Sequence, residues 1–392
     1  MQSFDLVISG AGMVGLTLAL ALKSSGLTVA IVDPKAEIYE LSDEPELRVS
    51  AINVASQKVF ESLDVWPLVL ASRAQAYTHM HVWDKDSFAS IDFDHQQVNQ
   101  DNLGHIVENA VITNSLLAVA KQSEHITFLT PDSVVKVDVN DHGCFIQTQN
   151  GEILSARLLV GADGGQSKVR QQANMPQTFW DYEQTAIVAT VKTALPHQQC
   201  ARQVFTEAGP LALLPLWDEH LCSIVWSQDT VKAADLLSLD GVQFGRALTA
   251  AFDNKLGVTE VVSQRQSFPL TMRYTRQWLK PRQIVLGDAA HTIHPLAGQG
   301  ANLGILEAGA LAKKLIALTE QQLDIGEVKN LRSFERESKN EAVKMIATME
   351  GFKRLFHGEN PLLKLVRGVG LTAVNQLPAL KQKIIMQAMG VS

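Results

Sequence analysis

The sequence predicts an α/β fold that carries an inserted antiparallel β-sheet and ends in helices. Three observations support this class. An apolar strand, a glycine-rich turn and a helix follow one another at residues 5–25, and the same order returns at residues 284–302. Between them, residues 185–270 alternate apolar and polar side chains with a period of two, which is typical of an antiparallel sheet. The sheet is therefore expected as an insertion between two parts of one α/β domain.

The first glycine-rich turn contains Gly10, Gly12 and Gly15 and lies inside a complete βαβ pattern. In such units the first glycine allows a tight turn, the second lets the backbone approach a pyrophosphate, and the third lets helix and strand pack closely. Asp33 lies eighteen residues after Gly15, where an acceptor for a ribose hydroxyl belongs. A purely structural turn is the alternative, and Asp33 argues against it. The strands and the helix are expected at residues 6–8, 28–32 and 16–25.

The second glycine-rich segment begins after an apolar strand at residues 284–286. Gly287 and Asp288 form its first turn. Backbone N–H groups in such turns, and the N-terminus of the helix that follows, favour an anionic ligand. The two segments together predict one long dinucleotide cofactor held at both ends. The loop that leads into the helix contains Pro295, Gly298, Gln299, Gly300, Ala301 and Asn302.

Other stretches extend this pattern. Short strands are expected at residues 80–84 and 89–94, a helix at residues 105–122, and a strand at residues 158–161. Residues 300–355 and the tail have mostly helical spacing. A cleft between the two domains is the expected ligand site. The predicted cofactor domain comprises residues 1–73, 100–180 and 277–355, the sheet domain residues 74–99 and 181–276, and the helical tail residues 356–392.

The composition limits the classes of function. The chain has 392 residues, a hydrophobic fraction of 46% and a net charge of −7. This balance favours a folded globular protein and argues against one that neutralises nucleic-acid phosphates. Three widely spaced cysteines predict neither a disulfide framework nor a metal or redox motif, in keeping with the reducing cytoplasm. The apolar stretch at residues 6–22 is interpreted as the first strand and helix, and no other stretch approaches the roughly eighteen apolar residues of a membrane span.

The end of the chain differs in charge from the rest. Residues 351–392 carry six lysines and arginines against one glutamate, among many apolar side chains. This segment is predicted either to contact an anionic membrane surface or to pack as helices on the cofactor domain or on a partner enzyme. The two alternatives stay open.

Three segments, in order, resemble the fingerprints of single-component FAD-dependent aromatic hydroxylases, the para-hydroxybenzoate hydroxylase class. They are residues 10–15, 161–170 and 287–291. The resemblance implies a Rossmann-like FAD-binding domain of the glutathione reductase type with a substrate-binding β-sheet domain. Because the chain has one complete Gly-x-Gly-x-x-Gly unit, NAD(P)H is expected to bind transiently. Further segments resemble the ubiquinone-biosynthesis branch, at residues 47–53, 83–88, 103–109, 178–182 and 291–300.

The resemblance also implies roles for the residues that match it. Asp33 would bind the adenosine ribose, Arg48 the pyrophosphate and the flavin edge, and Asp288 the ribityl chain. The turn at Asp163 and Gly164 resembles a segment that contacts both FAD and NAD(P)H. For Asn302 an ordinary helix N-cap is the alternative. The residues expected to position the flavin ring are Pro295, Gly298 and Gly300, with Gln299, Ala301 and Asn302 beside them.

The implied enzyme is a monooxygenase that uses FAD, NAD(P)H and O2 through a flavin C4a-hydroperoxide. Its implied substrate is a polyprenylated phenol, and the implied step of ubiquinone biosynthesis converts 2-polyprenylphenol to 2-polyprenyl-6-hydroxyphenol. No catalytic acid or base is assigned, because the protein's task is to position the reactants and exclude water. The implied location is the cytoplasm, with the enzyme bound peripherally to the inner face of the cytoplasmic membrane. The implied partner is a ubiquinone-biosynthesis enzyme complex. The alternatives are a sister hydroxylase for another ring position, a flavin-dependent prenyl reductase, and a non-catalytic lipid-binding scaffold subunit.

Several further residues are weaker candidates. His291 and His294 flank the predicted flavin loop, and since no carboxylate cluster accompanies them they are expected to order the loop rather than to bind a metal. Aromatic side chains in sheet segments usually pack in a core, which is the alternative for the aromatic candidates. The predicted substrate contacts are Arg202, Phe205, Pro215 and Trp226.

Overall fold

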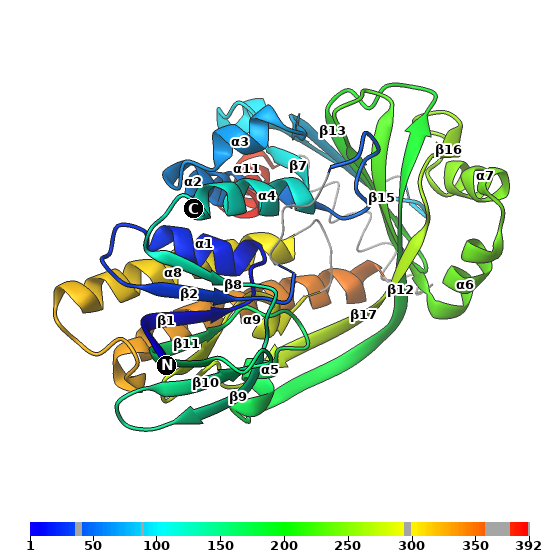
Figure 1. Cartoon of the computed structure of the whole chain (residues 1–392). Coiled ribbons are helices and arrows are strands. Elements are labelled where there is room, and N and C mark those ends of the chain that lie inside the picture. Colours follow the sequence, from blue (N-terminus) through cyan, green and yellow to red (C-terminus); the bar gives the residue numbers. More distant parts are fainter. Residues whose placement is uncertain (36–40, 88–89, 294–298, 357–376, 391–392) are drawn as a thin grey trace.

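The computed structural model describes residues 1–35, 41–87, 90–293, 299–356 and 377–390 of the chain. Two bodies lie side by side in Figure 1, one around β1 (Gln2–Ser9) and α1 (Met13–Ala21), the other around the long strands β12 (Gln177–Thr193) and β17 (Gln266–Thr275). The first body contains the two glycine-rich segments, and the second contains most of the period-two strands.

The first sheet is built mainly on parallel pairs. β1 pairs in parallel with β2 (Val29–Val32) on one side and with β11 (Ile153–Gly161) on the other. β8 (Ile126–Leu129) pairs in parallel with β2, and β19 (Gln283–Val285) with β11. The carboxyl ends of β1, β11 and β19 therefore meet at one edge, which brings the three glycine-containing turns together. Antiparallel pairs add β9 (Val134–Val139), β10 (Cys144–Thr148) and β18 (Leu279–Lys280).

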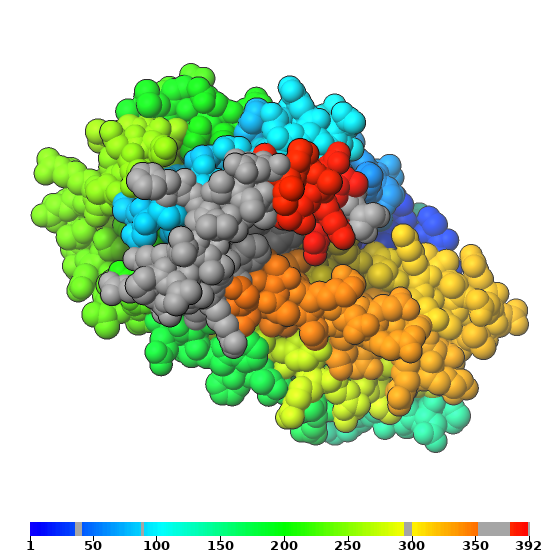
Figure 2. All heavy atoms as spheres, turned by 180° about the vertical axis from the view of Figure 1, so that it is seen from behind, coloured from blue at the N-terminus to red at the C-terminus, as the bar shows by residue number. Residues whose placement is uncertain are grey.

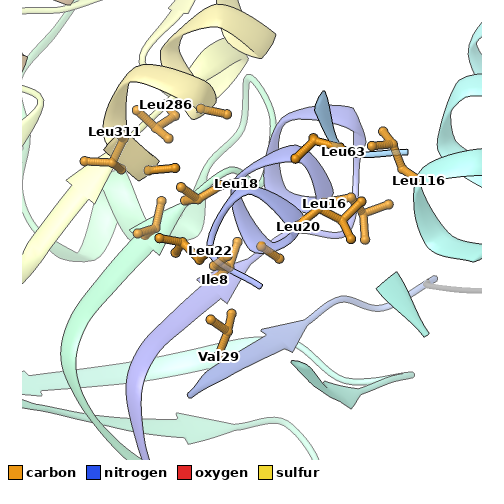
Figure 3. Packing of buried hydrophobic residues seen from close by; sticks show 14 of the residues in the cluster. Ile8, Leu16, Leu18, Leu20, Leu22, Val29, Leu63, Leu116, Leu286 and Leu311 are labelled. Atoms are coloured by element: carbon orange, nitrogen blue, oxygen red, sulfur yellow. The ribbon is translucent and has the colours of Figure 1, made fainter. Parts of the chain in front are cut away.

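Both faces of this sheet are buried, as expected of parallel strands. Leu6 and Ile8 of β1 contact one hydrophobic cluster, while Val7 between them contacts another. The first cluster lies between the sheet and the helices α1, α4 (Asn109–Ala120) and α8 (Gln299–Glu320), and Figure 3 shows Leu16 and Leu20 of α1 within it. The second lies on the opposite face with α5 (Lys168–Gln172). The predicted βαβ unit is confirmed.

The expected helix at residues 105–122 is wrong in its first turn. Gly104–Glu108 forms β7, which pairs with both β3 (Val49–Ile52) and β4 (Ala74–Tyr77) in a third, small sheet. The helix α4 begins only at Asn109. All five residues of β7 are buried, and a buried segment of only five residues is too short for its spacing to distinguish a strand from a helix. In the chain order, α2 (Val54–Ser62) and α3 (Trp66–Ala71) connect β3 to β4.

The second sheet is mainly antiparallel, as the period-two pattern predicts. β12 pairs with β17 on one side and with β15 (Leu221–Asp229) on the other, and β14 (Gly209–Pro215) and β13 (Cys200–Thr206) follow. β5 (His79–Asp84) and β6 (Ser90–Asp94) extend this edge, and η1 (His95–Val98) follows β6. β16 (Thr259–Val261) pairs with β12, and β20 (His291–Thr292) with β17. The chain segment after Gly287 thus joins the second sheet.

The two faces of the second sheet contact different helices. The outer face packs against α6 (Thr230–Ser238) and α7 (Gly241–Ala251), which lie on the side away from α1 in Figure 1. The inner face packs against α9 (Val328–Phe356), through Ile346 and Met349. Because α9 also contacts β18 of the first sheet, it connects the two bodies.

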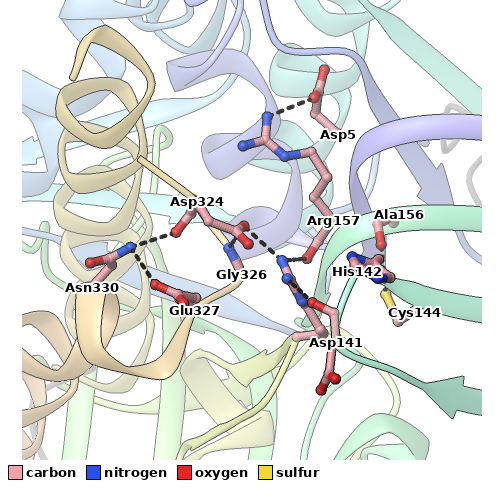
Figure 4. A network of polar contacts seen from close by, with 12 residues as sticks. Asp5, Asp141, His142, Cys144, Ala156, Arg157, Asp324, Gly326, Glu327 and Asn330 are labelled. Atoms are coloured by element: carbon pink, nitrogen blue, oxygen red, sulfur yellow. Dashed lines mark hydrogen bonds and ion pairs between the residues drawn. The ribbon is translucent and has the colours of Figure 1, made fainter. Parts of the chain in front are cut away.

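A polar network holds the connection between α8 and α9 against the first sheet (Figure 4). The Arg282 guanidinium is buried and donates to Asp324 Oδ1 at 2.6 Å and to the carbonyl oxygen of Asp141. The same Asp324 oxygen accepts from the Gly326 N–H at 3.0 Å. Three segments distant in sequence are thereby joined at one arginine.

The described part of the tail is the helix α11 (Pro378–Ala388), shown in red on the surface in Figure 2. Its Ile385 and the following Met389 pack against Val54, Val98 and Leu103. The Ala55 N–H at the start of α2 donates to the carbonyl oxygen of Met389 at 3.1 Å. The apolar side of α11 is therefore used within the protein. Among the described helices, none combines the length and the apolar character that a bilayer crossing requires.

Candidate active site

The turn after β1 contains two glycines that the packing of the backbone requires and one glycine that it does not require. A Cβ atom on Gly10 would lie 2.3 Å from the carbonyl oxygen of Ala162, and one on Gly15 would lie 2.0 Å from that of Gly10. Gly10 also has a φ of +111°, which favours glycine. At Gly12 a Cβ would meet nothing within 4 Å. The space above Gly12 therefore leaves room for a ligand.

The N-terminus of α1 faces this open space without a protein cap. Gly12 is its N-cap residue, no side chain caps it, and its first turn contains no acidic residue. The first amides of a helix lack partners inside the helix and carry partial positive charge. This arrangement fits the pyrophosphate of a dinucleotide.

Asp33 lies beside this turn, as predicted. Its Oδ2 accepts a hydrogen bond from the Ala11 N–H at 2.7 Å, and its Oδ1 accepts one from the Lys35 N–H at 2.6 Å. Because a carboxylate oxygen has two acceptor positions, each can accept a further bond from a ribose hydroxyl. The side chain thus both orders the turn and keeps acceptor capacity for a ligand.

The turn after β11 approaches the first one. The Ala162 N–H donates to the Ser9 carbonyl oxygen at 2.8 Å, so the two turns touch. Asp163 Oδ2 accepts from the Lys168 N–H at 2.8 Å at the start of α5, and Gly164 has a φ of +77°. Asp163 Oδ1 is buried and has no hydrogen-bond partner among the described residues. An acceptor of this kind requires a donor, which a bound ligand would supply.

A side chain without an assigned role joins the second and third turns. Arg170 of α5 is buried, and its guanidinium donates to the carbonyl oxygens of Gly165 and Ala289, both at 2.9 Å. The two carbonyls belong to segments more than 120 residues apart. The only feature of the sequence that pointed to Arg170 was its position at the end of the second fingerprint. That position does not reveal which carbonyl groups Arg170 bonds.

The third turn presents Asp288 within a set of cationic groups. Its side chain is accessible to solvent, but the surrounding protein still raises its pKa by desolvation. The positive charges of His291, Arg48 and Arg273 oppose this rise, whereas Glu307 adds to it. An anionic Asp288 would accept hydrogen bonds from the hydroxyl groups of a ribityl chain. Arg273 is a member of this set that the sequence did not indicate.

Arg48 connects this turn with the second sheet. Its guanidinium carbon lies 5.7 Å from the centre of the Phe268 ring, a distance suited to a cation–π contact. Phe268 pairs with Ala186 on the inner face of the second sheet. Arg48 is thus exposed at the junction of the two bodies, where the flavin edge was predicted.

The predicted flavin cradle is only partly described. Pro295 and Gly298 lie outside the described residues, as do His294 and the Gln299 side chain. Gly300 and Ala301 lie in the first turn of α8, and a Cβ on Gly300 would meet nothing within 4 Å. Their roles at the flavin stay predictions.

Asn302 uses its side chain inside the protein. Its Oδ1 accepts from the Asn53 N–H at 3.0 Å, and its Nδ2 donates to the Ala51 carbonyl oxygen at 2.7 Å. These two bonds join α8 to the end of β3 and the start of α2. The side chain therefore orders the N-terminal part of α8, and any ligand contact of Asn302 stays a prediction.

The four predicted substrate residues separate onto two faces of the second sheet. Phe205 lies on the inner face, in a cluster with Val82, Ile91 and Met349. Ile293, which precedes the predicted flavin loop, packs against this same cluster and also against the cluster around Trp278. Phe205 therefore lies in the cluster that Ile293, five residues after Asp288, packs against.

Trp226 lies on the outer face instead. Its ring centre is 5.7 Å from that of Phe244 in α7, inside the outer hydrophobic cluster. Arg202 is two residues from Val204 of this cluster, and its Nη1 donates to the carbonyl oxygen of His197 at 2.7 Å. Pro215 alternates in step with Leu211 and Leu213 of the same cluster. For Trp226 the geometry matches the core-packing alternative. Substrate contact of Trp226, Arg202 and Pro215 stays a prediction.

Three glycine-containing turns at one sheet edge, with an uncapped helix N-terminus and flanking carboxylates, define a dinucleotide-binding flavoprotein of the α/β class. Residues 3–348 match a family model described as FAD binding domain. The chain belongs to this family of FAD-dependent monooxygenases. The predicted cofactor FAD is confirmed, and enzymes of this class use NAD(P)H and O2 with it.

Similar proteins include several that are named for ubiquinone biosynthesis. The 3-demethoxyubiquinol 3-hydroxylase of Escherichia coli K12 is 31% identical over 99% of both chains. The ubiquinone biosynthesis monooxygenase COQ6 of Danio rerio is 32% identical, over 98% of this chain and 89% of its own. The ubiquinone hydroxylase UbiL of Rhodospirillum rubrum is 32% identical with the same shares. The resemblance to the ubiquinone-biosynthesis branch is thus confirmed.

Solved structures agree on the fold. The p-nitrophenol 4-monooxygenase PnpA of Pseudomonas putida DLL-E4 superposes with a TM-score of 0.80, at 17% identity, over 100% of this chain and 99% of its own. PqsL of Pseudomonas aeruginosa, described as a probable FAD-dependent monooxygenase, gives a TM-score of 0.78 at 20% identity over 95% and 100%. The predicted fold class, of the para-hydroxybenzoate hydroxylase type, is confirmed.

Proposed function

We propose that this enzyme hydroxylates the ring of a polyprenylated phenol in ubiquinone biosynthesis, converting 2-polyprenylphenol to 2-polyprenyl-6-hydroxyphenol. One observation carries the reaction class: the full-length similarity to relatives named for ubiquinone hydroxylation. The ring position rests on the resemblance of the sequence, from its first residues into the tail, to 2-polyprenylphenol hydroxylases, since hydroxylases of other ring positions share the motifs at residues 47–53 and 291–300. Because one relative is named for another substrate, as 3-demethoxyubiquinol 3-hydroxylase, a sister hydroxylase for another position is the second candidate.

The residues at the sheet edge would hold FAD along its length. The uncapped amides of α1 would bind the pyrophosphate, and Asp33 the adenosine ribose. Asp288 would bind the ribityl chain, with Arg48 between it and the second sheet. When bound, FAD supplies the activation of O2, of which one atom enters the ring and the other leaves as water with electrons from NAD(P)H.

The inner face of the second sheet would hold the substrate ring. Phe205 belongs to an apolar cluster there, and Ile293 connects that cluster to the segment that follows Asp288. Apolar walls exclude water from the site. An oxygen-transferring flavoenzyme needs this exclusion in order to avoid releasing hydrogen peroxide. Arg48 and Phe268, which contact each other at the junction of the two bodies, would border the ring. The protein's contribution is therefore orientation and desolvation.

The setting of the enzyme is a separate part of the proposal. We propose that the basic tail contacts a ubiquinone-biosynthesis partner enzyme or the inner membrane surface through residues 351–392. The apolar side of α11 packs on α2 and η1, whereas Lys383 and Leu380 are exposed. Sedimentation with anionic phosphatidylglycerol vesicles tests the membrane part. Equal sedimentation of the full chain and of a chain ending at residue 356 would contradict it.

The reaction is tested by deleting the gene and identifying the quinone precursor that accumulates by mass spectrometry. Build-up of the unhydroxylated 2-polyprenylphenol, restored by the wild-type gene and not by an Asp288→Ala variant, is the expected result. Build-up of a later, methylated precursor would move the assignment to the sister step. Normal quinone levels in the deletion strain would contradict a role in this pathway.

A further inference from the structure

A buried ion pair lies directly beneath the turn that carries Asp288. His291 Nε2 and Glu307 Oε1 are 2.6 Å apart, and their side chains are only 1% and 2% exposed. His291 comes from β20 and Glu307 from the middle of α8. Burying two charges costs desolvation energy, and a pair of this kind often adds little net stability. Its presence at this place therefore requires another explanation.

The second carboxylate oxygen of Glu307 explains why the ion pair lies at this place. Glu307 Oε2 accepts a hydrogen bond from the Gly287 N–H at 3.0 Å. Gly287 has a φ of +55°, and a Cβ there would lie 3.0 Å from Val14 Cγ2 of α1. The turn is thus held between the carboxylate of α8 and the first turn of α1. One side chain bonds both the residue before Asp288 and the histidine three residues after it.

The charges around the pair are consistent with an ionised state. Burial by itself lowers the pKa of His291, but the carboxylates of Glu307 and Asp288 outweigh it, so this pKa lies above its ordinary value of 6.5. The groups that face Asp288 from other elements are Arg48 and Arg273. The Trp278 ring lies 5.2 Å from that of His291 and closes the site on the sheet side. A protonated His291 donates to Glu307 and attracts Asp288.

We propose that Glu307 and His291 are positioning residues that fix the Gly287–Asp288 turn and thereby set how tightly the protein holds FAD. Neither touches the cofactor in this role: Glu307 acts through the Gly287 backbone, and His291 acts through Glu307 and through its charge beside Asp288. The inference rests on FAD binding and not on the ubiquinone substrate. It can therefore fail while the proposed function holds, and the reverse is also true.

The test uses the full-length holoenzyme without substrate. The variants are Glu307→Ala, which removes both bonds, and Glu307→Gln, which keeps one acceptor oxygen and loses the charge. The matched control is Glu320→Gln, at the exposed end of the same helix. FAD dissociation is followed by the rise of flavin fluorescence on serial dilution, and the visible circular dichroism of the bound flavin is recorded at saturating FAD.

The expected dissociation constant for FAD rises by at least tenfold in Glu307→Ala, by less in Glu307→Gln, and by less than twofold in the control. The flavin dichroism changes in the two variants and not in the control. If Glu307→Ala does not fold, Glu307→Gln and His291→Gln decide by the same two measurements. FAD affinities within twofold of wild type, or weaker binding with an unchanged flavin spectrum and a matching loss of chain stability, would overturn the proposal.

Discussion

Gly15→Ala and Gly12→Ala should affect different properties of the protein, although the two glycines are only three residues apart. A Cβ at position 15 would lie 2.0 Å from the carbonyl oxygen of Gly10, and a backbone oxygen cannot move away without moving the whole turn. At position 12 a Cβ meets nothing within 4 Å, and the φ of −76° suits any residue. Gly15→Ala should therefore impair folding, and Gly12→Ala should impair FAD binding.

The magnitudes follow from these contacts. Overpacking costs about 1–3 kcal/mol, and the rigid backbone at Gly10 places Gly15→Ala in the upper half of that range. For 392 residues with an unfolding entropy of about 2.1 cal/mol/K per residue, each kcal/mol corresponds to about 1.2 °C, so the melting temperature falls by roughly 2–4 °C. Gly12→Ala leaves the flavin-free chain within about 0.5 kcal/mol of wild type. Displacing the pyrophosphate from one amide forfeits about 1.5–3 kcal/mol, which weakens FAD binding roughly 10- to 150-fold.

Two measurements separate the variants. Thermal unfolding of the flavin-stripped chain reports the effect on folding, and flavin fluorescence on dilution of the holoenzyme reports FAD affinity. A Gly12→Ala chain that is destabilised as much as Gly15→Ala would refute the reasoning. So would a Gly15→Ala chain that melts at the wild-type temperature.

Three further predictions concern other contacts. Arg170→Ala removes the shorter hydrogen bond from each of two carbonyls, which within the described part of the chain keep only the longer bonds from Arg273 to Gly165 at 3.2 Å and from Thr275 to Ala289 at 3.4 Å. The substitution should lower the free energy of unfolding by about 1–3 kcal/mol, with Arg170→Lys only a partial rescue, as measured by chemical denaturation. Burial raises the pKa of Asp324, but the hydrogen bond from Arg282 outweighs it and the pKa lies below its ordinary value of 3.8. Asp324→Asn should therefore cost about 1 kcal/mol at pH 7, because the side chain is one-third exposed, and the gap to wild type should close as the pH falls below about 4. Phe205→Ala should uncouple NAD(P)H oxidation from hydroxylation and release hydrogen peroxide, whereas Trp226→Phe on the outer face should leave coupling unchanged. Equal uncoupling by both would contradict the assignment of the inner face.

The elements that carry the cofactor site could be predicted from the sequence because their signals are local. A strand, a turn with glycines at fixed spacing and a helix occur within about 25 residues, and the steric reasons for Gly10 and Gly15 arise within the same unit or at its neighbouring strand. The period-two segments likewise identify strands of the second sheet. The prediction of a helix at residues 105–108 was wrong, because this segment forms a strand only through its pairing with β3 and β4 on its two sides.

The side chains that complete the site could not be predicted, since their partners are distant in sequence. Arg170 bonds Ala289, Asn302 bonds Ala51 and Asn53, and Glu307 bonds Gly287 and His291. A residue type indicates which bonds a side chain can form but not which group will be near it. The same limit applies to Trp226 and Phe205, because strand spacing separates two faces without identifying which one contacts the cofactor domain.

The amino-acid order by itself therefore determined the class of fold, the three turns and the cofactor, because glycine spacing and side-chain period act over a few residues. Only the tertiary structure decided which face of the second sheet meets Ile293 after the Asp288 turn, which glycine is open to a ligand, and which buried carboxylate supports Asp288. These features depend on distances between segments that the chain brings together from opposite ends, and long-range packing sets those distances.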